Sequence, residues 1–279
     1  MDNNRRLSLN FHQTFIPERR YLSILLDKIG QNLFLSDKEL SALTSIPMGD
    51  TSGKLPATLA YAKGMGLVKL TTEKQRSISL TPLGELVKIE DPYLQEELTQ
   101  WIMHLELCKK SNGAELWYQV FNTCFKSFNS TFNTDQLENL LEQIIHKKKR
   151  NIIGPLLRTY AEDSALSLVD IVEADKNNPN QYLINSPPLL DSFGYYYGYL
   201  LISLWEETDI KSDNQVTITS LNEKTEIIDQ LNFNSRQFET LLLNIESLGL
   251  IDIDKQMSPW ILIKKSTKEN ILKKIYDLL

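Results

Sequence analysis

The order of elements predicted for residues 36–87 constrains the fold most: two short helices, a β-strand, a basic turn and a second strand. Ser36 and Glu39 have the spacing of a capping box, which predicts the start of the first helix. After a glycine-containing turn, apolar residues at helical spacing predict a second helix that ends at Gly64 and Gly66. Short strands are expected at 67–70 and 77–80.

This order is that of a winged helix, closed by a further helix that begins near Thr81 and Pro82. In such a module the second helix is the candidate recognition helix and the strand pair is the wing. Winged helices most often dock on DNA. We therefore expect residues 1–95 to form an N-terminal winged-helix DNA-binding domain.

Composition limits the alternatives. The chain has 279 residues and 42% hydrophobic content, which is enough for two or three compact domains. Its two cysteines, Cys108 and Cys124, are too few for a disulfide framework and are expected to be buried free thiols. No apolar run approaches the roughly 18 residues that a membrane span needs, and the first residues lack the apolar core of a secretory signal. We expect a cytoplasmic protein with no membrane partner.

The charge distribution favours DNA contact at the N-terminal end. The net charge is −6, yet residues 1–90 carry 12 Lys and Arg against 9 Asp and Glu. Residues 54–76 contain five basic residues and one acidic residue, Glu73. The alternative is an ordinary solvated face. The predicted phosphate contacts here are Lys54, Lys63, Lys69, Lys74 and Arg76.

The remainder of the chain predicts a helical middle and a second winged-helix-like module. Residues 96–212 are mostly helical by spacing, and residues 213–279 repeat the helix and hairpin order of the first module with fewer basic residues. The fold class is thus mainly α (α+β), with winged modules flanking a helical middle domain. The sequence supports two interpretations of the second module equally: a second DNA contact and a protein-docking wing.

One basic run lies in the middle domain. His146 is followed by Lys147, Lys148, Lys149 and Arg150. These charges oppose the dipole of the preceding helix C-terminus, which is a sufficient structural reason for some of them. Contact with DNA phosphates is the alternative.

Catalytic chemistry has few candidates. The three histidines do not form a pair with metal-ligand spacing. Glu162, Asp163 and Asp170 could hold Mg²⁺, although solvent exposure is the more common state of such residues.

The N-terminal segment places Phe11 and Phe15 around His12 and Thr14, shortly before Arg19 and Arg20. In one interpretation the aromatics pack on the first module and His12 makes a satisfied hydrogen bond. In the other, His12 and Thr14 are catalytic and the two arginines contact DNA.

This segment resembles the His-Glu-Thr-Phe signature of the bacterial family of the domain of unknown function numbered 4007, with Gln13 in place of the usual Glu. The resemblance covers most of the chain. It continues in residues 49–54 with Gly66-Leu67, around Trp117 and Phe121, and in Leu157-Arg158-Thr159-Tyr160, Asp163-Ser164 and Leu166-Ser-Leu168.

The resemblance implies a DNA-binding component of a DNA phosphorothioation system that supports anti-phage defence. Its partners would be double-stranded DNA and the sulfur-transfer and ATPase proteins of that system. The sequence does not determine the oligomeric state, and a homodimer is one of the alternatives. A DNA nickase is also implied as a family role, with Mg²⁺ or Mn²⁺ as its cofactor, whereas no cofactor is otherwise evident. If the family Glu ligates a metal or acts as a base, Gln13 removes that group. A winged-helix transcriptional regulator and a non-catalytic DNA-binding scaffold are the alternatives.

Overall fold

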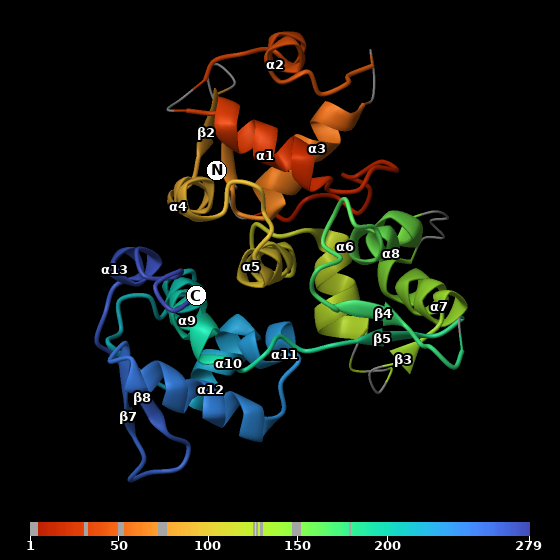
Figure 1. The fold of residues 1–279 in the computed structure, drawn as a ribbon. Helices are drawn as coiled ribbons and strands as arrows, with labels where there is room; N and C mark the ends of the chain where they lie inside the picture. Colours follow the sequence, from red (N-terminus) through yellow and green to blue (C-terminus); the bar gives the residue numbers. More distant parts are fainter. Residues whose placement is uncertain are drawn as a thin grey trace. The chain divides into compact units, whose positions relative to one another are not determined.

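The computed structural model describes residues 5–30, 33–49, 53–71, 77–124, 126, 128, 131–146, 152–178 and 180–279. The chain divides into two compact units, Met1–Asn185 and Ser186–Leu279. The fold is mixed α+β, with helices and three small antiparallel sheets (Figure 1). The sequence expected three domains with boundaries after residues 95 and 212. That division stays a prediction, and the helix at 194–206 packs on the C-terminal helices.

The first unit begins with the elements that the capping and turn signals predict. Its first part is made of α1 (Arg19–Lys28), α2 (Asp37–Thr44), α3 (Lys54–Gly64), β1 (Val68–Thr71), β2 (Ser77–Leu80) and α4 (Pro82–Glu90). The Ser36–Glu39 capping box is present at the start of α2, and the Thr81 side chain caps α4, where proline occupies the first turn. The predicted order of helices and strands is confirmed.

These elements share one apolar core. Helix α1 contacts α2, α3 and α4, and α3 packs on β1. Strands β1 and β2 pair antiparallel, with Val68 opposite Leu80. Gly84 in α4 lies against the backbone of Leu67, where a Cβ atom would overlap the Leu67 carbonyl oxygen, so only glycine lets α4 approach the hairpin this closely.

The second part of the first unit begins with a buried helix. It contains α5 (Glu97–Leu107), α6 (Glu115–Trp117), a π-helix η1 (Tyr118–Cys124), β3 (Thr131–Phe132), α7 (Thr134–Ile145), α8 (Ile153–Ala161), β4 (Val172–Ala174) and β5 (Tyr182–Ile184). Every residue of α5 from Leu98 onward is buried. The sequence offers Thr134 as the cap of α7, and the observed cap is Asn133, one residue earlier, in a capping box with Gln136.

The second unit is built around an aromatic helix. It consists of η3 (Asp191–Phe193), α9 (Gly194–Glu206), β6 (Gln215–Thr217), α10 (Ile218–Thr225), α11 (Ile227–Leu231), α12 (Ser235–Ser247), β7 (Ile251–Asp254), β8 (Ile261–Lys264) and α13 (Lys268–Leu272). Helices α10, α12 and α13 pack on α9, and α12 also contacts β7 (Figure 1). Tyr196, Tyr197 and Trp205 of α9 are buried, as expected for a packed core.

Some elements of this unit differ from expectation. The sequence also predicts a helix at 225–231, and the helix observed there, α11, begins at Ile227, because Glu226 adopts a left-handed backbone conformation after α10. The sequence predicts a last helix from Lys268 to Leu279, and the observed α13 ends at Leu272. The hairpin β7–β8 gains β6 as a third strand, in the order β6-β8-β7. Strand β6 is only three residues long, so it left no periodic signal in the sequence.

Candidate nucleic-acid interface

The N-terminal segment, residues 5–15, is anchored to the first unit by backbone bonds, an ion pair and ring contacts. Leu7 forms a parallel bridge with Ala114, and its side chain fills the space beside Gly64 of α3. The Arg6 guanidinium bonds the Glu115 carboxylate at 2.6 Å. Phe11 packs edge-on against Tyr61 of α3, with ring centroids 4.8 Å apart. The predicted packing of the N-terminal aromatics on the first module is thus confirmed for Phe11.

His12 is fully enclosed in this packing. Its side chain is 0% exposed, and its ring lies 5.5 Å from Phe11 and 6.1 Å from Trp117. Within the described residues neither ring nitrogen has a partner at full hydrogen-bond geometry. Burial lowers the pKa of His12 from 6.5 to about 4, with the nearby Gln13 backbone opposing part of the shift. The ring is therefore neutral at pH 7 and closed off from a phosphodiester in this conformation.

Thr14 does not share the environment of His12. It lies in the same turn but is exposed, whereas His12 is buried. The two residues proposed as a catalytic pair therefore present different sides of the segment, and the structure does not bring them together into one solvent-accessible site.

Gln13 has a structural role of its own. Its Oε1 accepts a hydrogen bond of 3.3 Å from the backbone N–H of Gly53, immediately before α3. Its backbone is left-handed, with φ of 56°, which aims the side chain at that loop. A carboxylate would accept the same bond, so the replacement of the family Glu by Gln retains this contact without any acid-base chemistry.

A buried polar network that the sequence did not predict joins Trp117, Tyr160 and His104. The Trp117 indole donates to the Tyr160 hydroxyl at 2.8 Å, and that hydroxyl lies 2.7 Å from Nδ1 of His104. The Tyr160 hydroxyl accepts from Trp117 and also bonds Nδ1 of His104, where the donor depends on the histidine tautomer. Burial lowers the pKa of His104 to about 3 and raises that of the Cys108 thiol, so both groups are neutral. Both cysteines are buried free thiols, as predicted.

Some of the basic residues predicted to contact DNA are engaged by groups of the first unit, two lie on α3 and β1, and the others lie outside the described residues. Arg19 is engaged internally, because its guanidinium donates to the carbonyl oxygens of Asp163 and Leu94. Lys54 and Arg20 both bind the carboxylate of Glu18. Lys63 is half-buried at the end of α3, and Lys69 is exposed on β1. Lys74, Arg76, Lys147, Lys148, Lys149 and Arg150 lie outside the described residues.

The candidate recognition helix is enclosed. Not one residue of α3, Lys54–Gly64, is exposed, and seven of its residues are buried. Its neighbours are α1, α2, α5 and β1. The remaining residues, Lys54, Pro56, Ala60 and Lys63, are half-buried, and the assignment of α3 as a recognition helix stays a prediction.

The basic residues of the second unit are largely paired. Four lysines form ion pairs of 2.6–2.9 Å, and a fifth, Lys264, lies over the Trp205 ring and donates to a carbonyl. The pairs are Lys224–Asp209, Lys255–Glu246, Lys265–Asp252 and Lys268–Glu206. With 14 acidic against 9 basic residues, this unit is a weak attractant for phosphates.

The residues that the structure describes contain no cluster of three or more side chains suited to a metal ion. Glu162 is held by Arg158 in an ion pair, and Asp163 and Asp170 are exposed. No helix in the described part of the chain has the length and apolar character needed to cross a membrane.

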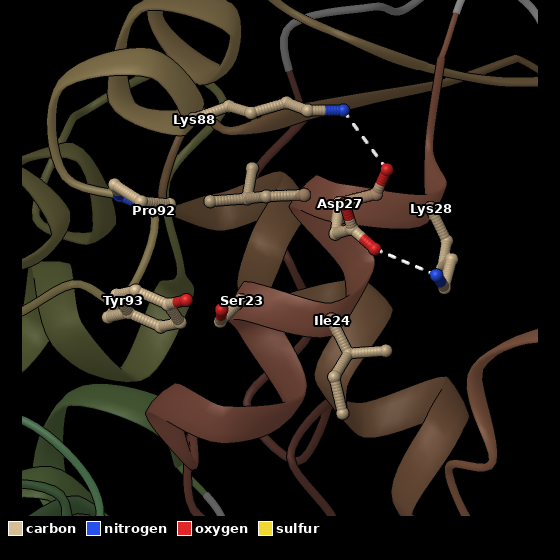
Figure 2. A pocket seen from close by; sticks show the side chains of 8 residues that line it. Ser23, Ile24, Asp27, Lys28, Lys88, Pro92 and Tyr93 are labelled. Carbon is tan, nitrogen blue, oxygen red and sulfur yellow. Dashed lines mark hydrogen bonds and ion pairs between the residues drawn. The ribbon is translucent and has the colours of Figure 1, made fainter.

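A surface pocket of about 460 Å³ lies between α1 and the end of α4 (Figure 2). Its rim carries Lys88, which donates to the Asp27 carbonyl at 3.0 Å, and Lys28, which pairs with the Asp27 carboxylate at 2.8 Å. The Lys28 contact lowers the pKa of Asp27. None of the predicted site residues lines this pocket.

The geometry defines a mixed α+β protein with a buried N-terminal histidine and a partly neutralised basic surface. Residues 10–187 match the family model described as protein of unknown function (DUF4007), and the chain belongs to this family.

Two solved structures have a similar fold over 97% of this chain and 88% of theirs, at 15% sequence identity. They are described as "Magnesium ion-bound SspB crystal structure", with a TM-score of 0.72, and "SspB crystal structure", with a TM-score of 0.71. No curated protein matches. At this identity the likeness shows a shared fold alone.

Proposed function

We propose that this chain is the DNA-binding component of a bacterial DNA phosphorothioation and anti-phage defence system in the cytoplasm. Membership of the DUF4007 family and the fold shared with SspB over nearly the whole chain support this proposal. The sequence resemblance to the same family implies partners that transfer sulfur and hydrolyse ATP.

The first unit would engage duplex DNA through a winged helix formed by residues 36–90. The observation that carries this proposal is the exposure of Lys69 on β1, a strand that the basic residues Lys74 and Arg76 follow in the sequence. The wing and α1 would then contact phosphates, and base reading by α3 is not required. Such contacts give affinity that falls steeply with salt and depends little on sequence.

The second unit would dock a partner protein. Four of its eight lysines are engaged by its own carboxylates, and α12 presents Arg236, Glu239 and Leu243 on its exposed face. A mixed, nearly neutral face with an exposed leucine is more typical of a protein interface than of a DNA contact. This favours the protein-docking alternative for the C-terminal module.

A nicking activity is the second candidate, favoured by the magnesium ion named for one of the similar structures. It would need a group other than His12 as it lies here, because that ring is closed off from solvent. A non-catalytic scaffold fits the described residues without further ligands. A transcriptional regulator would require tight binding to one operator over random duplex.

Gel-shift binding to a random duplex at two salt concentrations tests the main proposal. We expect binding that weakens from 50 to 200 mM salt and that the double variant Lys69→Glu with Arg76→Glu abolishes. Affinity that ignores both salt and these substitutions would contradict the wing model.

Supercoiled plasmid with Mg²⁺ or Mn²⁺ separates the nickase from the scaffold. Relaxed circle that also forms with His12→Ala would place the chemistry elsewhere in the chain. Relaxed circle that requires His12 would mean that the N-terminal segment opens on DNA.

A further inference from the structure

Four side chains from α1 and α3 form a compact charged cluster on the first unit. The Glu18 carboxylate binds Lys54 through Oε1, at 2.6 Å from Nζ, and Arg20 through Oε2, at 2.9 Å from Nε. The Tyr21 ring lies against both cations, 4.4 Å from the Arg20 guanidinium carbon and 4.9 Å from the Lys54 nitrogen. Glu18, Arg20 and Tyr21 are neighbours in sequence, and Lys54 joins them because α1 packs on α3.

The cluster has the arrangement of an anion held by two cations. Each carboxylate oxygen of Glu18 contacts a different cation, as the two non-bridging oxygens of a phosphodiester can do. Lys54 is the first residue of α3, whose N-terminal N–H groups add positive potential. Glu18 is the N-cap residue of α1, yet its side chain does not cap that helix. Its carboxylate is committed to the two cations instead.

Exposure indicates that a larger anion can reach the site. The Arg20 side chain is 65% exposed, while Glu18 and Lys54 are 14% and 23% exposed. Ion pairs near the surface are individually weak, so a doubly contacting phosphate can compete with the carboxylate. The neighbouring Arg19 does not contribute, because backbone carbonyls of the first unit already hold its guanidinium.

We propose that Arg20, Tyr21 and Lys54 form a phosphate-binding site for the nucleic-acid backbone, and that Glu18 occupies this site until a phosphate displaces its carboxylate. This inference rests on the proposed DNA-binding function and gives it a second contact beside the wing. Glu18 thereby limits non-specific affinity, because every phosphate bound here must first displace an internal anion.

The test measures binding of a fluorescent 20-base-pair duplex by anisotropy between 50 and 200 mM KCl. Glu18→Gln should tighten binding at 100 mM by about 2- to 5-fold, the range that an exposed ion pair represents. It should also steepen the salt dependence by about one unit of slope, because one more positive charge faces the DNA. Glu18→Asp keeps the charge and should bind like the wild-type protein.

A control variant and a double-variant background test whether the effect comes from this cluster. Glu85→Gln removes the same charge from an exposed position on α4 and should change affinity less than Glu18→Gln. In an Arg20→Gln, Lys54→Gln background the effect of Glu18→Gln should disappear, because the cations it frees are absent. Equal effects of the two glutamate variants, or an effect that persists in the double background, would overturn the proposal.

The source of the phosphate is tested with inorganic phosphate by titration calorimetry. Glu18-dependent binding of free phosphate without Glu18-dependent binding of duplex would overturn the nucleic-acid assignment. Binding of duplex that does not respond to Glu18→Gln would overturn this inference and leave the proposed function intact. Failure of the wild-type protein and of Glu18→Gln to bind duplex at 50 mM KCl would overturn both.

Discussion

Acidification should destabilise the first unit through His12. The folded-state pKa of about 4 lies below the unfolded value of 6.5, so the unfolded chain binds a proton first as the pH falls. The stability that the neutral ring provides is present above pH 6.5 and is lost as the pH falls towards 4. From pH 7.5 to pH 5 this linkage lowers the free energy of unfolding by about 2 kcal/mol, and the full shift is worth about 3 kcal/mol.

The assay is urea unfolding followed by circular dichroism at pH values from 5 to 7.5. His104 contributes a loss of the same sign, because burial lowers its pKa to about 3. The His12→Leu variant isolates the His12 part. Its free energy of unfolding should change less steeply with pH than that of the wild-type protein, by about 1 kcal/mol per pH unit near pH 5.

A matched control comes from the same cluster. Phe11→Leu removes a ring that packs 5.5 Å from His12 but removes no titratable group. It should lower the free energy of unfolding at all pH values and leave the pH slope unchanged. A His12→Leu variant that retains the wild-type slope would refute the reasoning, since His12 would then titrate alike in both states.

Two other substitutions test the packing around this site. Gly84→Ala should lower the free energy of unfolding by about 3 kcal/mol, because the new Cβ would overlap the Leu67 carbonyl and the backbone must shift. Tyr160→Phe should cost about 1–3 kcal/mol in the same measurement, because it leaves the Trp117 indole and Nδ1 of His104 without their shared partner.

Each has a control. Gly154→Ala in α8 meets no atom within 4 Å and should be neutral or stabilising by about 0.5–1 kcal/mol. Tyr182→Phe alters a hydroxyl on a ring stacked on Phe132 and should change stability by less than about 0.5 kcal/mol. Equal losses at Gly84 and Gly154, or at Tyr160 and Tyr182, would contradict these explanations.

Local signals in the sequence predicted much of the secondary structure. The capping boxes at Ser36 and Asn234 and the glycines that follow α3 and α12 determine where helices begin and end, since they act through neighbouring backbone groups. The π-helix at Tyr118–Cys124 gave no separate signal, because its apolar spacing reads as an ordinary helix.

The environment of the candidate site residues could not be predicted, because it is formed by contacts between distant parts of the chain. His12 looked like a catalytic group because its neighbours are chemically suggestive, but its burial comes from Trp117, more than a hundred residues away. Lys54 and Arg20 looked like free cations, and only tertiary packing shows that Glu18 holds both. Charge counting along the chain cannot detect such internal pairing.

The central claim is that the first unit contacts DNA and the second does not. Photo-crosslinking of the full chain to a duplex substituted with 5-iodouracil, followed by mass spectrometry of the peptides, measures this directly. The account predicts crosslinks in peptides that contain residues 17–21, 54 or 66–81. Crosslinks confined to Ser186–Leu279, or none at 50 mM salt, would contradict it.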